Sequence, residues 1–163
     1  MVSHNERFKN KEYDLFSEKN KPDHPILKLS EQSIDEASCH EHLGVLLSSN
    51  MSWKAHIEKI HQNASKTLNL LKGFKFKLSR LTLEILYKSL VRSKMEYANV
   101  VFDGCTLGES DLLENVQYDA AKLISGAMRG THRESVLIDY GLHTLSNRRK
   151  IQKLLLLYKM VKV

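Results

Sequence analysis

The sequence predicts an α+β fold, with a small antiparallel strand region followed by a bundle of four or five helices. In the first third, short apolar runs alternate with turn residues such as Asn20, Pro22 and Pro25. From Ser52 onward the spacing of apolar residues changes from two to about 3.6, the helical period. Glycines and capping residues then separate successive helical stretches. The predicted regions are 1–50 (strands), 51–104 (a helical pair) and 105–163 (further helices).

The first region is expected to hold about four short strands. They are predicted at 13–17, at 26–29, weakly around 34–37, and at 42–47. The last of these is apolar enough to be covered on both faces. The intervening segment 30–33 is a turn candidate.

The first helix is expected to begin after Ser52, whose hydroxyl can accept a hydrogen bond from an amide of the first turn. Gly73 is expected to close it in a left-handed conformation. One apolar stripe follows at spacings of three and four, made of Ile57, Ile60, Ala64, Leu68 and Leu71.

The second and third helices have similar signals. Ser79 is the expected cap of the second helix and Gly104 its expected end, whereas the third helix is expected to run from Ser110 to Gly126 or Gly130. The buried stripe of the second is predicted as Leu83, Leu86, Leu90, Tyr97 and Val101, widened by Ile85 and Val91. That of the third is predicted as Leu112, Val116, Ala120, Leu123 and Ala127.

Two further helices are predicted near the end of the sequence. A short one covers Glu134 to Asp139 and stops at Gly141. Thr144 caps the last. Its buried stripe is expected to be Ile151, Leu154, Leu155 and Tyr158.

Positive charge is concentrated in residues 52–94, which carry a formal charge of +8, against −3 for residues 1–51 and +1 for residues 95–163. A cluster of cations on one element is typical of a surface that binds phosphates, and the alternative is a solvated helix face. The hinge between the two helices alternates Phe74 and Phe76 with lysines, so its rings either stack on bases or are buried beside a basic loop. The candidate contacts to a nucleic-acid backbone are Lys59, Lys66, Lys72, Lys75, Lys77 and Arg80.

Other functional classes find little support. Cys39, His40 and His42 resemble a metal cluster but have no second ligand pair, so no metal site and no cofactor are predicted. Lone cysteines and the lack of a leader predict an intracellular protein, cytoplasmic or nuclear. The longest apolar run is too short to cross a membrane, and no small-molecule site is expected. A second basic cluster, Arg148-Arg149-Lys150, starts a helix, where the helix dipole disfavours cations, so a partner or an acid of unidentified kind is expected nearby.

Seven passages share a family likeness: His42–Val45, Ser48–Ile57, Leu70–Tyr87, Met95–Asp103, Leu113–Lys122, Arg129–Thr131 and Thr144–Arg149. In this order and spacing they resemble the reverse transcriptases of non-LTR (LINE-type, jockey-like) retrotransposons. The resemblance spans about residues 13–163.

The resemblance implies the edge of a polymerase palm followed by the helical thumb and the connection beyond it. In that arrangement His42, Leu43 and Gly44 would lie near the primer grip, and the thumb would hold a template–primer duplex, RNA–DNA or DNA, together with the rest of a reverse transcriptase. The family's paired catalytic aspartates are absent, since none of the seven aspartates here is adjacent to another. We therefore expect a fragment without catalysis of its own, Mg²⁺ serving only the intact enzyme. The alternatives are a stand-alone protein–protein interaction module and a non-functional fragment.

Overall fold

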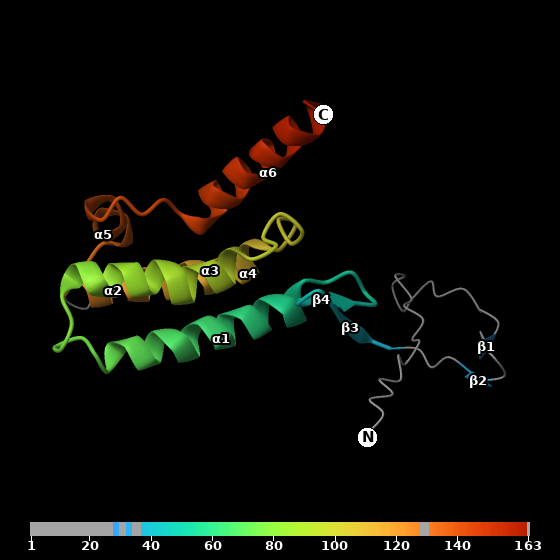
Figure 1. Cartoon of the computed structure of the whole chain (residues 1–163), viewed down its shortest axis with the longest axis horizontal. Coiled ribbons are helices and arrows are strands. Elements are labelled where there is room, and N and C mark those ends of the chain that lie inside the picture. The colour runs from blue at the N-terminus through green and yellow to red at the C-terminus, as the bar shows by residue number, and fades with distance from the viewer. Residues whose placement is uncertain (1–27, 30–31, 34–36, 128–130, 163) are drawn as a thin grey trace, which may run out of the picture. The chain divides into compact units, whose positions relative to one another are not determined.

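The computed structural model describes residues 28–29, 32–33, 37–127 and 131–162 and confirms the α+β fold (Figure 1). Contacts divide the chain into two units, residues 1–53 and residues 54–163, and each is described by itself. The strand predicted at 13–17 and the exit glycine Gly130 lie outside the described residues.

The first unit contains two small antiparallel sheets. Strand β1 (Lys28–Leu29) pairs with β2 (Gln32–Ser33), so part of the predicted turn 30–33 is a strand. Strand β3 (Cys39–His42) pairs with β4 (Val45–Ser48), with His42 opposite Val45.

The prediction of one strand over 42–47 is wrong, because the chain reverses direction at Leu43 and Gly44. Both residues have positive φ, 46° and 79°, as in the two-residue turns that match the twist of a hairpin. Val45 is buried, whereas Leu47 is exposed, so the segment is not covered on both faces.

The second unit begins with α1 (Lys54–Lys72), and its predicted stripe is confirmed. Ile57, Ile60, Ala64, Leu68 and Leu71 are all buried. The conformation predicted for Gly73 is wrong, because its φ is not positive. Its amide instead donates to the Leu70 carbonyl at 3.1 Å and continues the chain into a tight turn.

Residues 80–96 form one continuous helical segment, made of α2 (Arg80–Leu86), the π-helix η2 (Tyr87–Arg92) and α3 (Ser93–Glu96). The cap predicted at Ser79 is confirmed, since its hydroxyl accepts from the Thr82 amide at 3.1 Å. The residues buried along the segment, at a spacing of four, are Leu83, Tyr87, Val91 and Met95.

Most of the stripe predicted for this segment is wrong. Leu90, Tyr97 and Val101 are exposed, as is Ile85. The wider turns of the π-helix keep every fourth residue on the buried side. The prediction had assumed the α-helical period of 3.6 residues throughout the segment. The helix also ends at Glu96 rather than Gly104, because Tyr97 is extended and Ala98 has a positive φ of 51°.

Helix α4 (Leu107–Ser125) starts three residues before the predicted Ser110. Thr106 and Glu109 form a capping box, in which each side chain accepts from the other residue's amide. Gly126 ends the helix with φ 74°, as predicted. Of the predicted stripe, Val116, Ala120 and Leu123 are buried while Leu112 and Ala127 are half-buried; Leu113, Gln117, Ala121 and Ile124 complete the buried face.

The last two helices lie where they were predicted. They are α5 (Arg133–Asp139), followed by Gly141 with φ 58°, and α6 (Leu145–Val161), capped by Thr144. The predicted burial of the last stripe is wrong. Its residues Ile151, Leu154, Leu155 and Tyr158 are exposed, because nothing in the described chain covers them.

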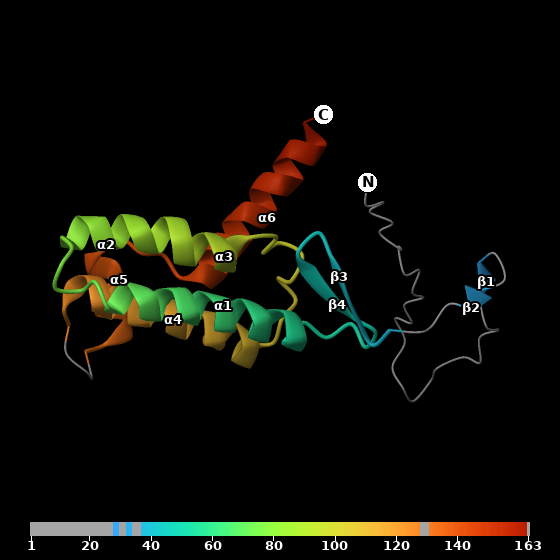
Figure 2. The ribbon, with the colours of Figure 1, turned by 60° about the horizontal axis from the view of Figure 1, so that its bottom comes forward.

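Figures 1 and 2 show α1 lying alongside the segment 80–96 and α4, with α6 extending away from these helices. The core of the unit lies where α1, η2 and α4 meet, and Ile57, Tyr87 and Leu113 are among its fully buried side chains. None of the described helices is both long enough and apolar enough to cross a membrane.

Candidate nucleic-acid interface

The basic hinge, defined as residues 72–80, is a hydrogen-bonded turn rather than a loose linker. The amides of Lys77 and Leu78 both donate to the Phe74 carbonyl, at 2.9 and 3.1 Å. The Lys75 amide donates to the Lys72 carbonyl at 3.2 Å. These bonds fix the backbone that carries the cations of the hinge.

The hinge cations have different surroundings. Lys72 donates to the Asn69 side chain at 3.0 Å, and the Lys75 ammonium lies 5.7 Å from the centre of the Phe76 ring. A Cβ placed on Gly126 would lie 3.9 Å from a terminal nitrogen of Arg80. Arg80 therefore reaches the C-terminal end of α4, where the helix dipole attracts a cation.

Two further candidate lysines lie on α1. Lys59 is half-buried and Lys66 is exposed. Seven residues separate them, so they point in nearly the same direction, about 10 Å apart along the helix axis. Lys72 is six residues beyond Lys66 and points elsewhere. The six predicted contacts thus divide into an α1 pair and a hinge group.

Four acids of the second unit form ion pairs with cations outside the candidate set. Ion pairs join Glu84 to Lys88, Glu96 to Arg92 and Arg148, Asp103 to Arg149 and Lys153, and Asp119 to Lys122. No acid occurs in the sequence between Glu58 and Glu84. In the described part of the chain, Lys66, Lys75 and Lys77 make no ion pair.

The hinge also exposes aromatic surface. Phe76 is 94% exposed and Phe74 48%, so the alternative of two buried rings beside a basic loop is wrong. Leu70 and Leu81, on either side of the hinge, are exposed as well. The hinge therefore combines unpaired positive charge with uncovered apolar groups.

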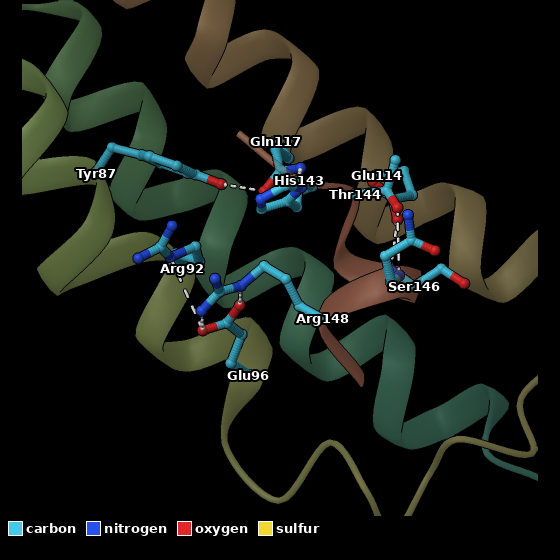
Figure 3. A network of polar contacts seen from close by, with 10 residues as sticks. Tyr87, Arg92, Glu96, Glu114, Gln117, His143, Thr144, Ser146 and Arg148 are labelled. Carbon is cyan, nitrogen blue, oxygen red and sulfur yellow. Dashed lines mark hydrogen bonds and ion pairs between the residues drawn. The ribbon is translucent and has the colours of Figure 1, made fainter. Parts of the chain in front are cut away.

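Of the two alternatives expected beside the second basic cluster, a partner or an acid, the structure shows acids. Arg148 donates two hydrogen bonds to the Glu96 carboxylate, one of them 3.0 Å long, and Arg92 lies 3.8 Å from the same carboxylate (Figure 3). This fork-shaped pairing raises the pKa of Arg148. Arg149 is buried, where it donates to Ser110 and lies 4.0 Å from Asp103.

A series of buried hydrogen bonds beside this cluster was not predicted from the sequence. The Tyr87 hydroxyl donates to the Gln117 side chain at 2.9 Å, and Gln117 donates to the His143 carbonyl at 3.0 Å (Figure 3). Glu114 accepts from the Ser146 amide at 2.9 Å. Burial raises the pKa of the Tyr87 hydroxyl above its usual range. The available signal was the pair of polar residues, Glu114 and Gln117, on an apolar face of α4.

These hydrogen bonds and the ion pairs of Arg148 and Arg149 hold the start of α6 against η2, α3 and α4. Every carboxylate among them has a partner, so these charges serve to stabilise the fold. They differ in this respect from those of the basic hinge.

In the first unit, the predicted grip residues His42, Leu43 and Gly44 form the end of β3 and the hairpin turn. The His40 and His42 rings lie 6.4 Å apart, and the Cys39 sulfur contacts the Ser48 hydroxyl at 3.4 Å. Within the described residues, no group of three or more His, Cys, Asp or Glu side chains is arranged to hold a metal ion.

No protein-family model matches this chain, and neither a curated protein nor a solved structure was found to be similar to it.

Proposed function

We propose that the basic hinge and the adjacent face of α1 hold a nucleic acid by its phosphate backbone. The observation that carries the proposal is the difference in pairing: Lys66, Lys75 and Lys77 make no ion pair in the described chain, while Glu84, Glu96, Asp103 and Asp119 pair with other cations. Cations that already face a carboxylate gain little from a phosphate, whereas unpaired cations release counterions from the nucleic acid when they bind it.

The ligand in this proposal is a template–primer duplex, and the chain is the holding part of a LINE-type reverse transcriptase. This part of the proposal rests on the sequence resemblance. We propose an intracellular location, cytoplasmic or nuclear; both described cysteines, Cys39 and Cys105, are free thiols, which is ordinary in a reducing compartment. We assign no catalysis to this chain alone, and primer extension with purified protein and Mg²⁺ or Mn²⁺ would contradict that by giving robust product.

Fluorescence anisotropy with a labelled RNA–DNA hybrid tests the binding proposal. If about five cations contact phosphates, log K falls against log salt with a slope of about −4 to −5 between about 50 and 200 mM NaCl. Hybrids of unrelated sequence should bind equally, because phosphates carry no base code. A flat signal at the lower salt concentration, through micromolar protein, would contradict the proposal.

One observation favours a second function, protein–protein interaction through α6. From Ile151 to Val161 this helix exposes apolar side chains recurring at spacings of three and four, including Leu154, Leu155 and Tyr158. Residues 145–162 carry six cations and no acid. The partner that fits is a protein with an apolar groove rimmed by carboxylates, because like charge opposes pairing with a second copy.

The two functions make different predictions for salt and for mutation. Replacing Leu154 and Tyr158 by serine should abolish capture of an acidic partner while leaving hybrid binding unchanged. A monodisperse monomer at high concentration agrees with this choice of partner, whereas a dimer that the double substitution dissociates would assign the helix to self-association instead.

A further inference from the structure

We propose that Phe76 stacks on an unpaired base, so that the hinge recognises a single-stranded segment next to the duplex rather than the duplex alone. This inference rests on the proposed nucleic-acid function and adds to it the kind of strand that is recognised. Its starting observation is that the Phe76 ring is 94% exposed, the most exposed large apolar side chain among the described residues.

The turn fixes the backbone that carries the ring. Two hydrogen bonds to the Phe74 carbonyl fix the backbone immediately after Phe76. Because this backbone is already hydrogen-bonded, less backbone freedom is lost when the ring binds than in a loop without such bonds. Isolated exposed apolar residues are common, so exposure alone does not carry the inference.

The second observation is the charge beside the ring. The Lys75 ammonium lies 5.7 Å from the ring centre, and Lys77 follows directly in the sequence without an ion-pair partner in the described chain. An aromatic ring between cations is the arrangement that binds single strands, with the base on the ring and the phosphates on the lysines. An apolar protein groove would use the ring but would not require the spaced cations, whereas an anionic membrane could use both and is therefore an arm of the experiment.

The geometry of nucleic acids restricts the ligand further. The faces of the bases inside a duplex are already stacked on one another, so a protruding ring can reach a base face only at an unpaired nucleotide or at a duplex end. A hybrid duplex with a single-stranded overhang therefore offers both parts of this surface: phosphates for the α1 lysines and an unpaired base for Phe76.

The experiment uses the full chain and two labelled hybrids, one blunt and one with an overhang that carries 2-aminopurine. The wild-type protein should prefer the overhang and should quench 2-aminopurine fluorescence. Phe76→Ala should weaken overhang binding by between about fivefold and a hundredfold. It should weaken blunt-duplex binding far less, because a blunt duplex exposes only the base faces at its two ends, and it should leave the salt slope unchanged. Phe76→Trp should restore the preference, whereas Phe76→Leu, which is apolar without a comparable π-face, should not.

Each other outcome identifies what has failed. If wild-type protein binds neither hybrid, the proposed function itself is wrong. If both hybrids are bound with the expected salt slope but Phe76→Ala changes nothing, only the stacking inference is overturned. An equal loss on both hybrids would also overturn it, as would tight binding of phosphatidylserine vesicles that depends on Phe76 without any quenching. Because the ring is exposed, Phe76→Ala should keep the wild-type melting temperature, which a thermal scan checks.

Discussion

Two clusters of cations in the helical unit have opposite surroundings. Arg148 and Arg149 meet Glu96 and Asp103, residues about fifty positions away that fold against them. Lys75 and Lys77 meet no carboxylate in the described chain, and an exposed ring lies between them. The comparison shows that a run of cations stabilises the fold where an acid packs against it. Where no acid does, the run remains a candidate binding surface.

The largest predicted effect comes from removing the Glu96 carboxylate, which Arg92 and Arg148 share. Glu96 is only 15% exposed and holds both Arg148 and Arg92. Glu96→Gln leaves two partly buried guanidinium groups without their counter-charge, so we expect a loss of roughly 2 kcal/mol in the free energy of unfolding. Urea denaturation measures it. The matched change in the hinge, Lys77→Gln, should alter stability by less than about 0.5 kcal/mol; equal losses in the two variants would remove the distinction between the clusters.

A second prediction concerns the buried hydrogen bonds that link Tyr87, Gln117 and the His143 carbonyl. Tyr87→Phe removes the hydroxyl that donates to Gln117 and leaves a buried amide oxygen without that donor, which should cost about 1–2 kcal/mol. Tyr158→Phe is the control, because Tyr158 is exposed on α6.

The same residue predicts a pH dependence. Because the pKa of Tyr87 is raised in the folded state, the unfolded chain loses the proton first, and stability falls as pH rises above about 10. Tyr87→Phe should flatten this alkaline loss. Stability curves recorded across that range check the sign, and a wild-type protein that gains stability there would contradict it.

The smallest predicted effect separates Arg80 from the other hinge cations. Its guanidinium reaches the C-terminal end of α4, so Arg80→Gln should lower stability by about 0.5 kcal/mol, and added salt should reduce the difference. Lys75→Gln should show no such loss. If both variants match the wild type in urea denaturation at low salt, Arg80 belongs with the unpaired cations.

Sequence reasoning succeeded where a single element carried its own signal. The α1 stripe was predicted fully because its apolar residues share one face, and the Ser79 and Thr144 caps because capping is local. It failed where the answer depended on distant contacts. Which residues of the segment 80–96 face the core depends on the π-helix and on the hydrogen bond from Tyr87 to Gln117, thirty residues away.

Two further errors have local causes of a different kind. The hairpin at Leu43 and Gly44 lacks the usual Asn-Gly signal. Leu43 occupies the first turn position in a left-handed conformation that its side chain does not favour. The stripe of α6 has the pattern of a buried face, yet no described element packs on it. For the candidate site, the sequence identified the cations but not which of them would be neutralised.

The most direct test of the central claim compares two triple variants with the same net charge. One changes Lys66, Lys75 and Lys77 to glutamine, and the other changes Lys150, Lys159 and Lys162, which are exposed on α6 and at its C-terminal end. The first variant, on α1 and the hinge, should reduce the steepness of the salt dependence of hybrid binding by nearly 3, about 0.9 for each lost phosphate contact, while the α6 variant should keep the wild-type slope. Equal changes in the two slopes would show that overall charge, and not the unpaired hinge, attracts the nucleic acid.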